Sequence, residues 1–441
     1  MSTAALPGFR EFYPEQLAQR AWLFERWRDV ARRFGFVEYD GPPLEPLELY
    51  TRKSGDEIVG QLYNFTDKGD RAVALRPEMT PTVARMVAAR ANALRKPVRW
   101  FSIPQLFRYE RQQKGRLREH FQLNVDIFGE SDVAADAELL AMACEIMRAC
   151  GLTHEDVVAR VSDRRLLTAL LKALGVPDGA VGAVFGAVDK IEREAPASLE
   201  RKMIEAGVSA TAAGRVLELV KASDFESLRT EFSNDADVLT ALERFDAYVL
   251  LLGAHGVRDY LKLDLTIVRG LAYYTGIVFE LFDAKGEFRA ICGGGRYDNL
   301  LSALGGVDMP ALGFGLGDVV LSELLKARGK MPSGAPAIDY WVAPLDVSYR
   351  LSVVEISAAL RSDGASVEYP FRDQALPKQL KAASTVGARD VVIVGERYRT
   401  SREVELKSLA DGTQRTIAVD ALRTLAREHS REHSRNTPRR P

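Results

Sequence analysis

Residues 106–130, LFRYERQQKGRLREHFQLNVDIFGE, decide the fold of this chain. With the residues before them they form two runs rich in aromatic and β-branched side chains, VRWFSIPQLFRYE (98–110) and HFQLNVDIFG (120–129), which predict strands. The polar segment between them, RQQKGRLRE (111–119), predicts a loop. The stretch is therefore expected to form an antiparallel hairpin with a long charged loop, which indicates an α+β sheet.

This hairpin is unusually basic. Residues 85–118 contain ten Lys or Arg and one acid, Glu110, whereas the whole chain of 441 residues has a net charge of −1. Such a local positive potential is what a phosphate-bearing substrate or a nucleic acid requires. The alternative is a solvated basic face. Eight of the ten cations are Arg, whose planar fork suits phosphate, and this favours a ligand.

A second hairpin is expected further along, where YYTGIVFELF (273–282) is joined to EFRAIC (287–292) by a short turn. Adjacent strand residues face opposite sides of a sheet, so Tyr273 and Tyr274 are expected not to share a role. The three glycines of ICGGGRYDNLL (291–301) are expected between a strand and a helix. They predict either a tight turn or a close approach of the backbone to a ligand.

Composition and residue pattern predict five parts of the chain. These are an α+β core, a helical insertion within it, a linker, a small α/β domain of βαβαβ order, and a disordered basic tail. Asp163 precedes an apolar-periodic segment and is expected to cap its helix. The linker is rich in Pro, Gly and Ser, and the tail contains five Arg and two Glu. The expected bounds are 1–163 with 259–327 for the core, 164–258 for the insertion, 328–339 for the linker, 340–425 for the α/β domain and 426–441 for the tail.

Several classes of protein are excluded. Cys144, Cys150 and Cys292 lack CxxC spacing, which predicts neither a disulfide framework nor a zinc cluster and favours a reducing cytosol. No apolar run approaches the ~18 residues of a membrane span. Dinucleotide, phosphate-loop, HExxH and GxSxG motifs are absent from the sequence. We therefore expect a cytoplasmic protein without a metal site or membrane contact.

In order along the chain, over about residues 5–420, these segments resemble the histidyl-tRNA synthetases, which are class II aminoacyl-tRNA synthetases. The resemblance implies a class II catalytic domain with an antiparallel sheet and a C-terminal anticodon-binding domain. GFREFYPE (8–15), with the helix and strand up to Pro42, matches motif 1, which forms the dimer interface. Residues 106–130 match motif 2, which holds ATP. VRGLAYYTG (268–276) and CGGGRYD (292–298) match the two peptides specific to histidyl enzymes.

The resemblance implies a homodimeric ligase that activates histidine with ATP and Mg²⁺, releases pyrophosphate, and transfers histidine to the 3′ end of tRNA(His). Glu78 and Thr80 match residues that take the α-amino group of histidine, and Asp126 stands where many members have Glu. The implied histidine-binding residues are Glu78, Met79, Thr80, Gln122, Asp126, Tyr273, Tyr274 and Tyr297. The four-residue spacing of Gln122 and Asp126 places both on one face of a strand.

The resemblance also implies the residues that handle ATP. Arg108 matches an arginine that grips the α-phosphate, Glu110 an acid near the adenine, and Arg116 a loop arginine directed at the γ-phosphate. Arg269 matches an arginine at the α-phosphate, where charge builds up as the histidine carboxylate attacks, so Arg108 and Arg269 are the expected catalytic residues. Chemistry of this kind is catalysed mainly by positioning and fixed positive charge.

The chain departs from the family's pattern at two places. Val319 and Val320 stand where motif 3 usually has Glu and Arg, and Ala272 replaces a usual acid beside Arg269. These departures leave open a histidine-binding paralogue that acts as a regulatory subunit of ATP phosphoribosyltransferase. That alternative predicts loss of the C-terminal domain and of the Arg269 peptide, and both are present. A generic nucleic-acid-binding protein would explain the basic hairpin but not the pocket residues.

Overall fold

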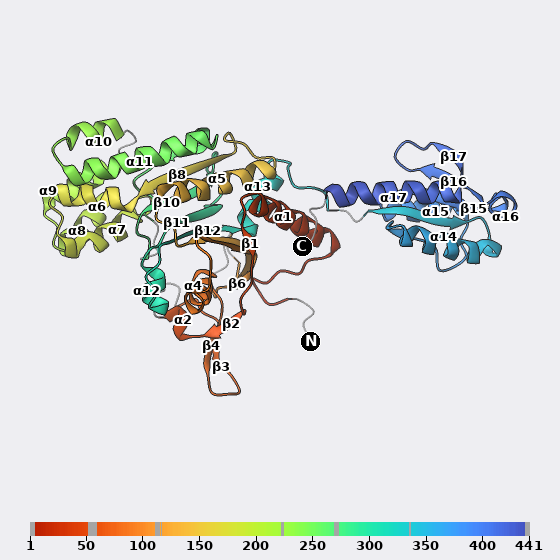
Figure 1. Cartoon of the computed structure of the whole chain (residues 1–441), viewed down its shortest axis with the longest axis horizontal. Coiled ribbons are helices and arrows are strands. Elements are labelled where there is room, and N and C mark those ends of the chain that lie inside the picture. The colour runs from red at the N-terminus through yellow and green to blue at the C-terminus, as the bar shows by residue number, and fades with distance from the viewer. Residues whose placement is uncertain are drawn as a thin grey trace. The chain divides into compact units, whose positions relative to one another are not determined.

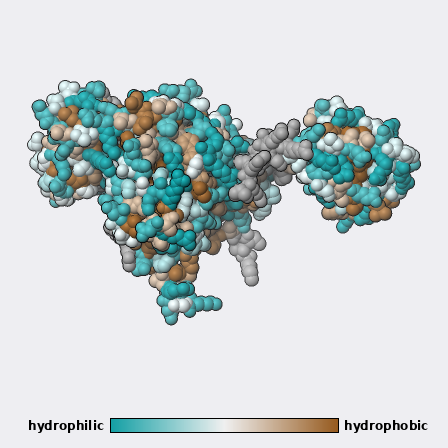
Figure 2. All heavy atoms as spheres, viewed as in Figure 1, coloured by the Kyte–Doolittle hydropathy of each residue, from teal (hydrophilic) through white to brown (hydrophobic). Residues whose placement is uncertain are grey.

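The structure is a computed structural model that describes residues 5–51, 60–110, 115, 117–221, 225–268, 273–334 and 337–436. The chain divides into two compact units, Met1–Glu11 with Arg20–Met331 and Phe12–Gln19 with Pro332–Pro441 (Figure 1). Each unit has its own buried apolar core. No helix among the described residues is long and apolar enough to cross a membrane, and hydrophilic atoms dominate the face shown in Figure 2.

A large sheet forms the centre of the first unit. In the described residues its strand order is β1-β5-β7-β12-β11-β10-β8-β9, with β6 paired to β7. Only the β1–β5 and β8–β9 pairs are parallel, so the predicted α+β fold is confirmed. The strands are β1 (Val37–Glu38), β5 (Val98–Ser102), β6 (Gln105–Phe107), β7 (Glu119–Phe128), β8 (Val157–Asp163), β9 (Leu261–Leu263), β10 (Ile277–Asp283), β11 (Cys292–Arg296) and β12 (Ala311–Gly317).

Helices cover this sheet, and a small sheet of order β2-β4-β3 lies beside it in the same unit (Figure 1). Leu23 and Trp27 of α1 are fully buried in the main core, in the same cluster as Leu123 and Val125 of β7. The apolar face of α1 is therefore used within its own chain. The elements are α1 (Pro14–Arg33), β2 (Leu44–Pro46), α2 (Glu48–Thr51), β3 (Asn64–Thr66), β4 (Ala72–Leu75), α4 (Thr80–Ala89), α5 (Val133–Ala149), α12 (Leu300–Gly305) and α13 (Asp318–Ala327).

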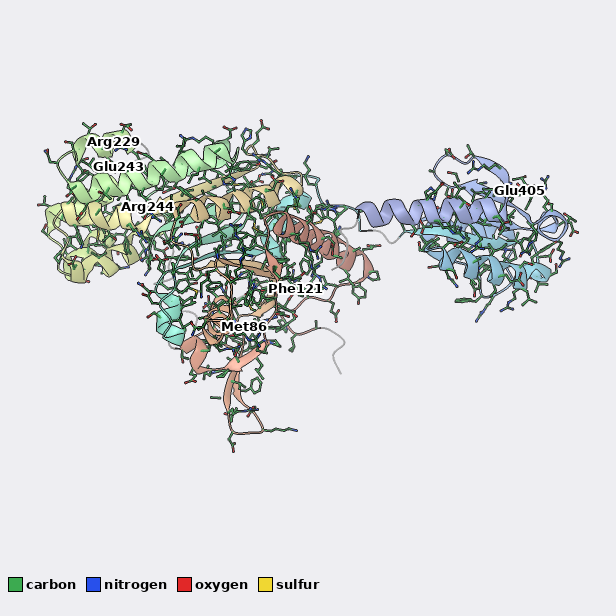
Figure 3. The ribbon with its side chains drawn as sticks, in the orientation of Figure 1. Met86, Phe121, Arg229, Glu243, Arg244 and Glu405 are labelled. Atoms are coloured by element: carbon green, nitrogen blue, oxygen red, sulfur yellow. The ribbon has the colours of Figure 1, made fainter. Side chains whose placement is uncertain are left out.

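Helices fill the chain between β8 and β9 and gather at one side of the sheet (Figure 1). Asp163 caps the first of them by accepting a hydrogen bond of 2.7 Å from the backbone N–H of Arg165, as the sequence predicts. Arg244 (Figure 3) lies 3.7 Å from the carboxylate of Asp136 on α5, which links the last helix to the main core. The helices are α6 (Arg164–Ala173), α7 (Val181–Val188), α8 (Pro196–Glu205), α9 (Ala210–Leu219), α10 (Phe225–Glu231) and α11 (Ala236–Ala254).

The second unit contains a five-stranded sheet of order β14-β13-β15-β16-β17. Its first three strands are parallel and alternate with helices, which agrees with the predicted βαβαβ order, and an antiparallel hairpin of β16 and β17 extends it. The elements are β13 (Ile338–Pro344), α14 (Arg350–Ser362), β14 (Val367–Glu368), α15 (Leu376–Thr385), β15 (Ala388–Val394), α16 (Glu396–Ser401), β16 (Glu403–Ser408), β17 (Gln414–Ala418) and α17 (Val419–Asn436).

The predicted disorder of residues 426–441 is wrong up to Asn436, because α17 continues to that residue. Ala426 is fully buried in the core of the second unit. Arg423 and Arg427 both bond to the carboxylate of Asp363, at 2.6 and 2.7 Å, and these bonds lower the pKa of Asp363. Burial and charge pairing thus hold the start of the predicted tail in a helix. Residues 437–441 lie outside the described residues.

Candidate active site

A chain of hydrogen-bonded polar side chains runs along one face of β7. Gln122 donates through Nε2 to Asn124 Oδ1 at 3.0 Å, and Asn124 donates through Nδ2 to Asp126 Oδ2 at 2.7 Å. The hydroxyl of Tyr297 donates to Asp126 Oδ1. The alternation of a strand places residues 122, 124 and 126 on the same face, as predicted for Gln122 and Asp126. Both oxygens of Asp126 are therefore held by donors.

Two glycines of the neighbouring strand make room for these side chains. Gly313 of β12 lies opposite Asp126, and a Cβ at Gly313 would be 2.4 Å from Asp126 Oδ1. A Cβ at Gly315 would likewise be 2.4 Å from Gln122 Nε2. Both distances are far shorter than a van der Waals contact. Glycine at these positions therefore lets Asp126 and Gln122 lie across the sheet.

The glycines of CGGGRYD lie inside β11 rather than in a turn, so the tight turn, one of the two predicted alternatives, is wrong. A Cβ at Gly294 would be 2.5 Å from the carbonyl oxygen of Gly313, and a Cβ at Gly295 would be 2.7 Å from that of Ile277. Close approach of the neighbouring strands thus explains these glycines. It places Tyr297, which follows β11, next to Asp126.

Burial sets the electrostatics of the pocket. Asp126 is 1% exposed, and burial raises its pKa to about 7, although the hydrogen bonds from Tyr297 and Asn124 oppose the shift. Burial, together with Asp126, also raises the pKa of Tyr297 well above its usual range, so Tyr297 stays protonated and can donate. A buried carboxyl group that titrates near neutral pH favours a ligand with an N–H donor. Aromatic rings form the wall around it.

Three tyrosine rings form that wall. The ring centroids of Tyr273 and Tyr274 are 5.0 Å apart, and those of Tyr273 and Tyr297 are 5.7 Å apart. The two adjacent rings therefore touch, whereas the prediction that Tyr273 and Tyr274 do not share a role stays a prediction. Both residues precede β10, which begins at Ile277, so strand alternation does not apply to them.

The second group of predicted residues surrounds the start of α4. Glu78 and Met79 are 6% and 0% exposed, and Thr80 is the first residue of the helix. Arg108 donates through Nε to the carbonyl oxygen of Pro77 at 2.9 Å, which anchors its guanidinium at the residue before Glu78. The structure thus brings Arg108 to the segment that contains the proposed α-amino-binding residues.

The remaining predicted residues are Glu110, Arg116 and Arg269. Glu110 is buried, and its carbonyl oxygen accepts a hydrogen bond of 3.5 Å from Arg118 Nε. Arg116 and Arg269 lie outside the described residues, as does Ala272. Their predicted roles stay predictions.

Two residues of the site face of β7 were missed by the sequence analysis. Asn124 links Gln122 to Asp126, and His120 lies two positions before Gln122 on the same face. Burial, and then the charge of Arg108, lowers the pKa of His120 to about 3, so its imidazole is neutral at physiological pH. Strand periodicity counted outward from Gln122 would have identified both.

Comparisons with known proteins show the family of the chain. The family model described as histidyl-tRNA synthetase matches residues 8–318, and the model of an anticodon binding domain matches residues 339–429. A histidine–tRNA ligase of Opitutus terrae is 45% identical over 96% of this chain and 98% of its own length. The chain belongs to the histidyl-tRNA synthetase family. The resemblance predicted from the sequence is thereby confirmed.

Other members of the histidyl-tRNA synthetase family are similar along most of this chain. The chloroplastic and mitochondrial histidine–tRNA ligase of Arabidopsis thaliana is 39% identical over 94% of the chain and 85% of its own length. The crystal structure of histidyl-tRNA synthetase from Nostoc sp. PCC 7120 has a TM-score of 0.82, at 24% identity, over 97% of this chain and all of that chain.

A solved structure from Bacillus halodurans C, described as an ATP phosphoribosyltransferase regulatory subunit/histidyl-tRNA synthetase, has a TM-score of 0.73. It covers 90% of this chain and 99% of its own, at 22% identity. At that identity the likeness concerns the fold alone. The class II fold of the histidyl-tRNA synthetases is therefore shared, and the regulatory alternative gains no further support.

Proposed function

We propose that the protein is a histidine–tRNA ligase, which activates histidine with ATP and then charges tRNA(His). The single observation that carries this proposal is the buried Asp126, held by Tyr297 and Asn124 inside the tyrosine wall. An imidazole N–H pointing at Asp126 would meet a fixed acceptor. A competing amino acid without that N–H would bury Asp126 without the additional hydrogen bond, which costs far more than a missing methylene.

In the proposed activation step, an oxygen of the histidine carboxylate attacks the α-phosphorus of ATP, and the bond to pyrophosphate breaks. Glu78 holds the ammonium group of histidine, with Met79 and Thr80 beside it. Arg108, fixed by Pro77, faces the α-phosphate, and Arg269 shares the charge that develops there. Glu110 contacts the adenine, and Arg116 the γ-phosphate. Fixed cations of this kind stabilise the transition state without reorganising.

Mg²⁺ enters this proposal as part of the nucleotide substrate. Within the described residues, no group of three or more His, Cys, Asp or Glu side chains is arranged to hold a metal ion. The phosphate oxygens are hard ligands that Mg²⁺ prefers, usually with one or two carboxylates and several waters. The chain's own contribution is to position the phosphates with Arg108.

The proposal extends to the whole chain. Residues 1–163 with 259–327 form the catalytic core and 164–258 the insertion. The second unit, whose elements run from β13 (Ile338–Pro344) to α17 (Val419–Asn436), is the domain that binds the anticodon of tRNA(His). The enzyme acts in the cytoplasm as a homodimer through α1 and β1. The edge position of β1 in the large sheet and the 63% exposure of Val37 support this choice of interface.

Exchange of radioactive pyrophosphate into ATP tests the activation step. The purified protein should catalyse exchange with histidine and not with the other amino acids. Asp126→Asn, whose amide keeps the shape of the carboxyl group, should raise the KM for histidine about tenfold or more, because a charged acceptor is lost. The regulatory alternative predicts that histidine binds and that no exchange occurs, and this outcome would overturn the proposal.

A further inference from the structure

The start of α13 has no arginine. If the protein has the proposed function, on which this inference rests, another cation must hold the phosphates of ATP. Val320 lies on the first turn of α13 and is half-buried. Its side chain carries no charge and cannot bond to phosphate. Instead it lines a pocket of about 330 Å³, together with Gly115, Phe288, Arg289 and Glu323.

Three segments that are distant in the sequence meet at this pocket. A Cβ at Gly115 would lie 3.6 Å from Val320 Cγ2 and 3.8 Å from Arg289 Cδ. The stem of Arg289 and the side chain of Val320 therefore approach the same point of the motif 2 loop. Arg289 comes from the β10–β11 connection, so its side chain reaches this place from a different element than α13.

The pocket lies toward the Gln122 end of the site, away from Asp126 and Tyr297. The N–H of Gly317 donates to the carbonyl oxygen of Ile291 at 3.4 Å, and Gly317 pairs with Gln122 of β7. Asp126 pairs instead with Gly313, four residues earlier on β12. The β10–β11 connection and the start of α13 are thus beside the end of β7 that leads into the motif 2 loop. This is the end where the proposed function places the outer phosphates of ATP.

The acids around the pocket have cation partners of their own. Glu287 lies 3.2 Å from a guanidinium nitrogen of Arg328, and Glu323 lies 3.6 Å from Nζ of Lys326. Arg289 is exposed and lines the same pocket, and a guanidinium in this position suits a polyanion.

We propose that Arg289 binds the outer phosphates of ATP and supplies the guanidinium that α13 lacks at Val320. A bond between a guanidinium and a phosphate oxygen is charge-assisted and can be bidentate. Arg289 then acts in nucleotide binding, whereas histidine contacts are made by Asp126 and the tyrosines. The separation of these roles makes the proposal testable.

The test is Arg289→Ala in the full chain, with pyrophosphate exchange and equilibrium binding measured together. The KM for ATP should rise about tenfold or more, and the KM for histidine should stay within about twofold. Affinity for the β,γ-imido analogue of ATP should fall by a similar factor, while affinity for AMP stays unchanged. Lys285→Ala, an exposed cation in the same connection, is the matched control and should leave all four values unchanged.

The double variant Arg289→Ala, Val320→Arg should recover most of the lost affinity, because it returns a guanidinium to the same pocket. Unchanged affinity of Arg289→Ala for the β,γ-imido analogue would overturn the inference. An equal loss for AMP would also overturn it, because the guanidinium would then contact the nucleoside part. If the unmodified protein binds histidine and nucleotide but does not exchange pyrophosphate, the proposed function fails, while nucleotide binding still decides the role of Arg289.

Discussion

At the scale of single residues, Asp126 is the group on which the pocket depends. Its side chain is one methylene shorter than the Glu of many family members, and Tyr297 and Asn124 hold both of its oxygens. The sequence predicted Gln122 and Asp126 on one strand face through their spacing. It did not predict the Tyr297–Asp126 bond, because strand pairing brings these residues together from 171 positions apart.

The raised pKa of Asp126 makes a prediction about stability. The pKa is about 7 in the folded protein against 3.8 for a solvated aspartate, so the protonated form stabilises the apo fold. This contribution is fully present below pH ~4 and is lost as the pH rises to ~7. Asp126→Asn cannot titrate, so its denaturation midpoint relative to wild type should rise between pH 5 and pH 8. Parallel pH profiles of the two proteins would contradict this, and Asp308→Asn, an exposed acid, is the control.

Arg269 carries a second prediction at this scale. If the residues facing the α-phosphate act as proposed, Arg269→Ala should slow adenylate formation by ~10²-fold, the usual scale for losing one preorganised donor to developing charge. Histidine binding should stay within a few fold. Single-turnover formation of histidyl-adenylate measures the first quantity and equilibrium dialysis the second. Equal losses in both would show that Arg269 binds histidine instead.

At the scale of elements, β7, β11 and β12 form the floor of the site. Alternation of aromatic and β-branched residues was sufficient to predict β7 and β10, and Asp163 marked the start of α6. The strand predicted at residues 287–292 is misplaced, because β11 begins at Cys292. Glycine has no side chain to show alternation, so the sequence did not reveal the strand at residues 293–295. In the same way, the sequence of α17 does not reveal Asp363, the distant acid that pairs with its arginines.

The glycine floor is tested by Gly313→Ala. The added Cβ would lie 2.4 Å from Asp126 Oδ1 and 2.6 Å from the carbonyl oxygen of Val125, so the Asp126 side chain and its strand must shift. We expect the KM for histidine to rise at least about tenfold, because a charge-assisted hydrogen bond is disturbed. The KM for ATP should change little. Gly317→Ala on the same strand is the control, since a Cβ there meets nothing within 4 Å. Equal effects of the two substitutions would contradict the role given to Gly313.

At the scale of the whole molecule, the chain consists of two units whose proposed tasks differ. A chain ending at Met331, the last residue of the first unit, should keep histidine-dependent pyrophosphate exchange. It should lose tRNA charging by orders of magnitude, because the anticodon contacts are gone. If this shortened chain charges tRNA as well as the full chain, the assignment of the second unit is wrong.

The proposed homodimer makes a further prediction. Val37 is 63% exposed on the edge strand β1, so Val37→Asp should weaken the dimer without disturbing the core. Light scattering should report a dimer for the unmodified protein and a shift toward monomer for the variant, with exchange activity falling in parallel. A fully active monomeric wild type would contradict the proposal.

The most direct test of the central claim is the charging of tRNA(His) with radioactive histidine by the intact chain. Both units and both substrate sites must act in this one reaction. The account predicts histidyl-tRNA that depends on ATP and histidine and is absent with a tRNA of another specificity. Failure to charge tRNA(His), with histidine still bound at the Asp126 pocket, would contradict the account and identify the protein as a histidine-binding member of the family without ligase activity.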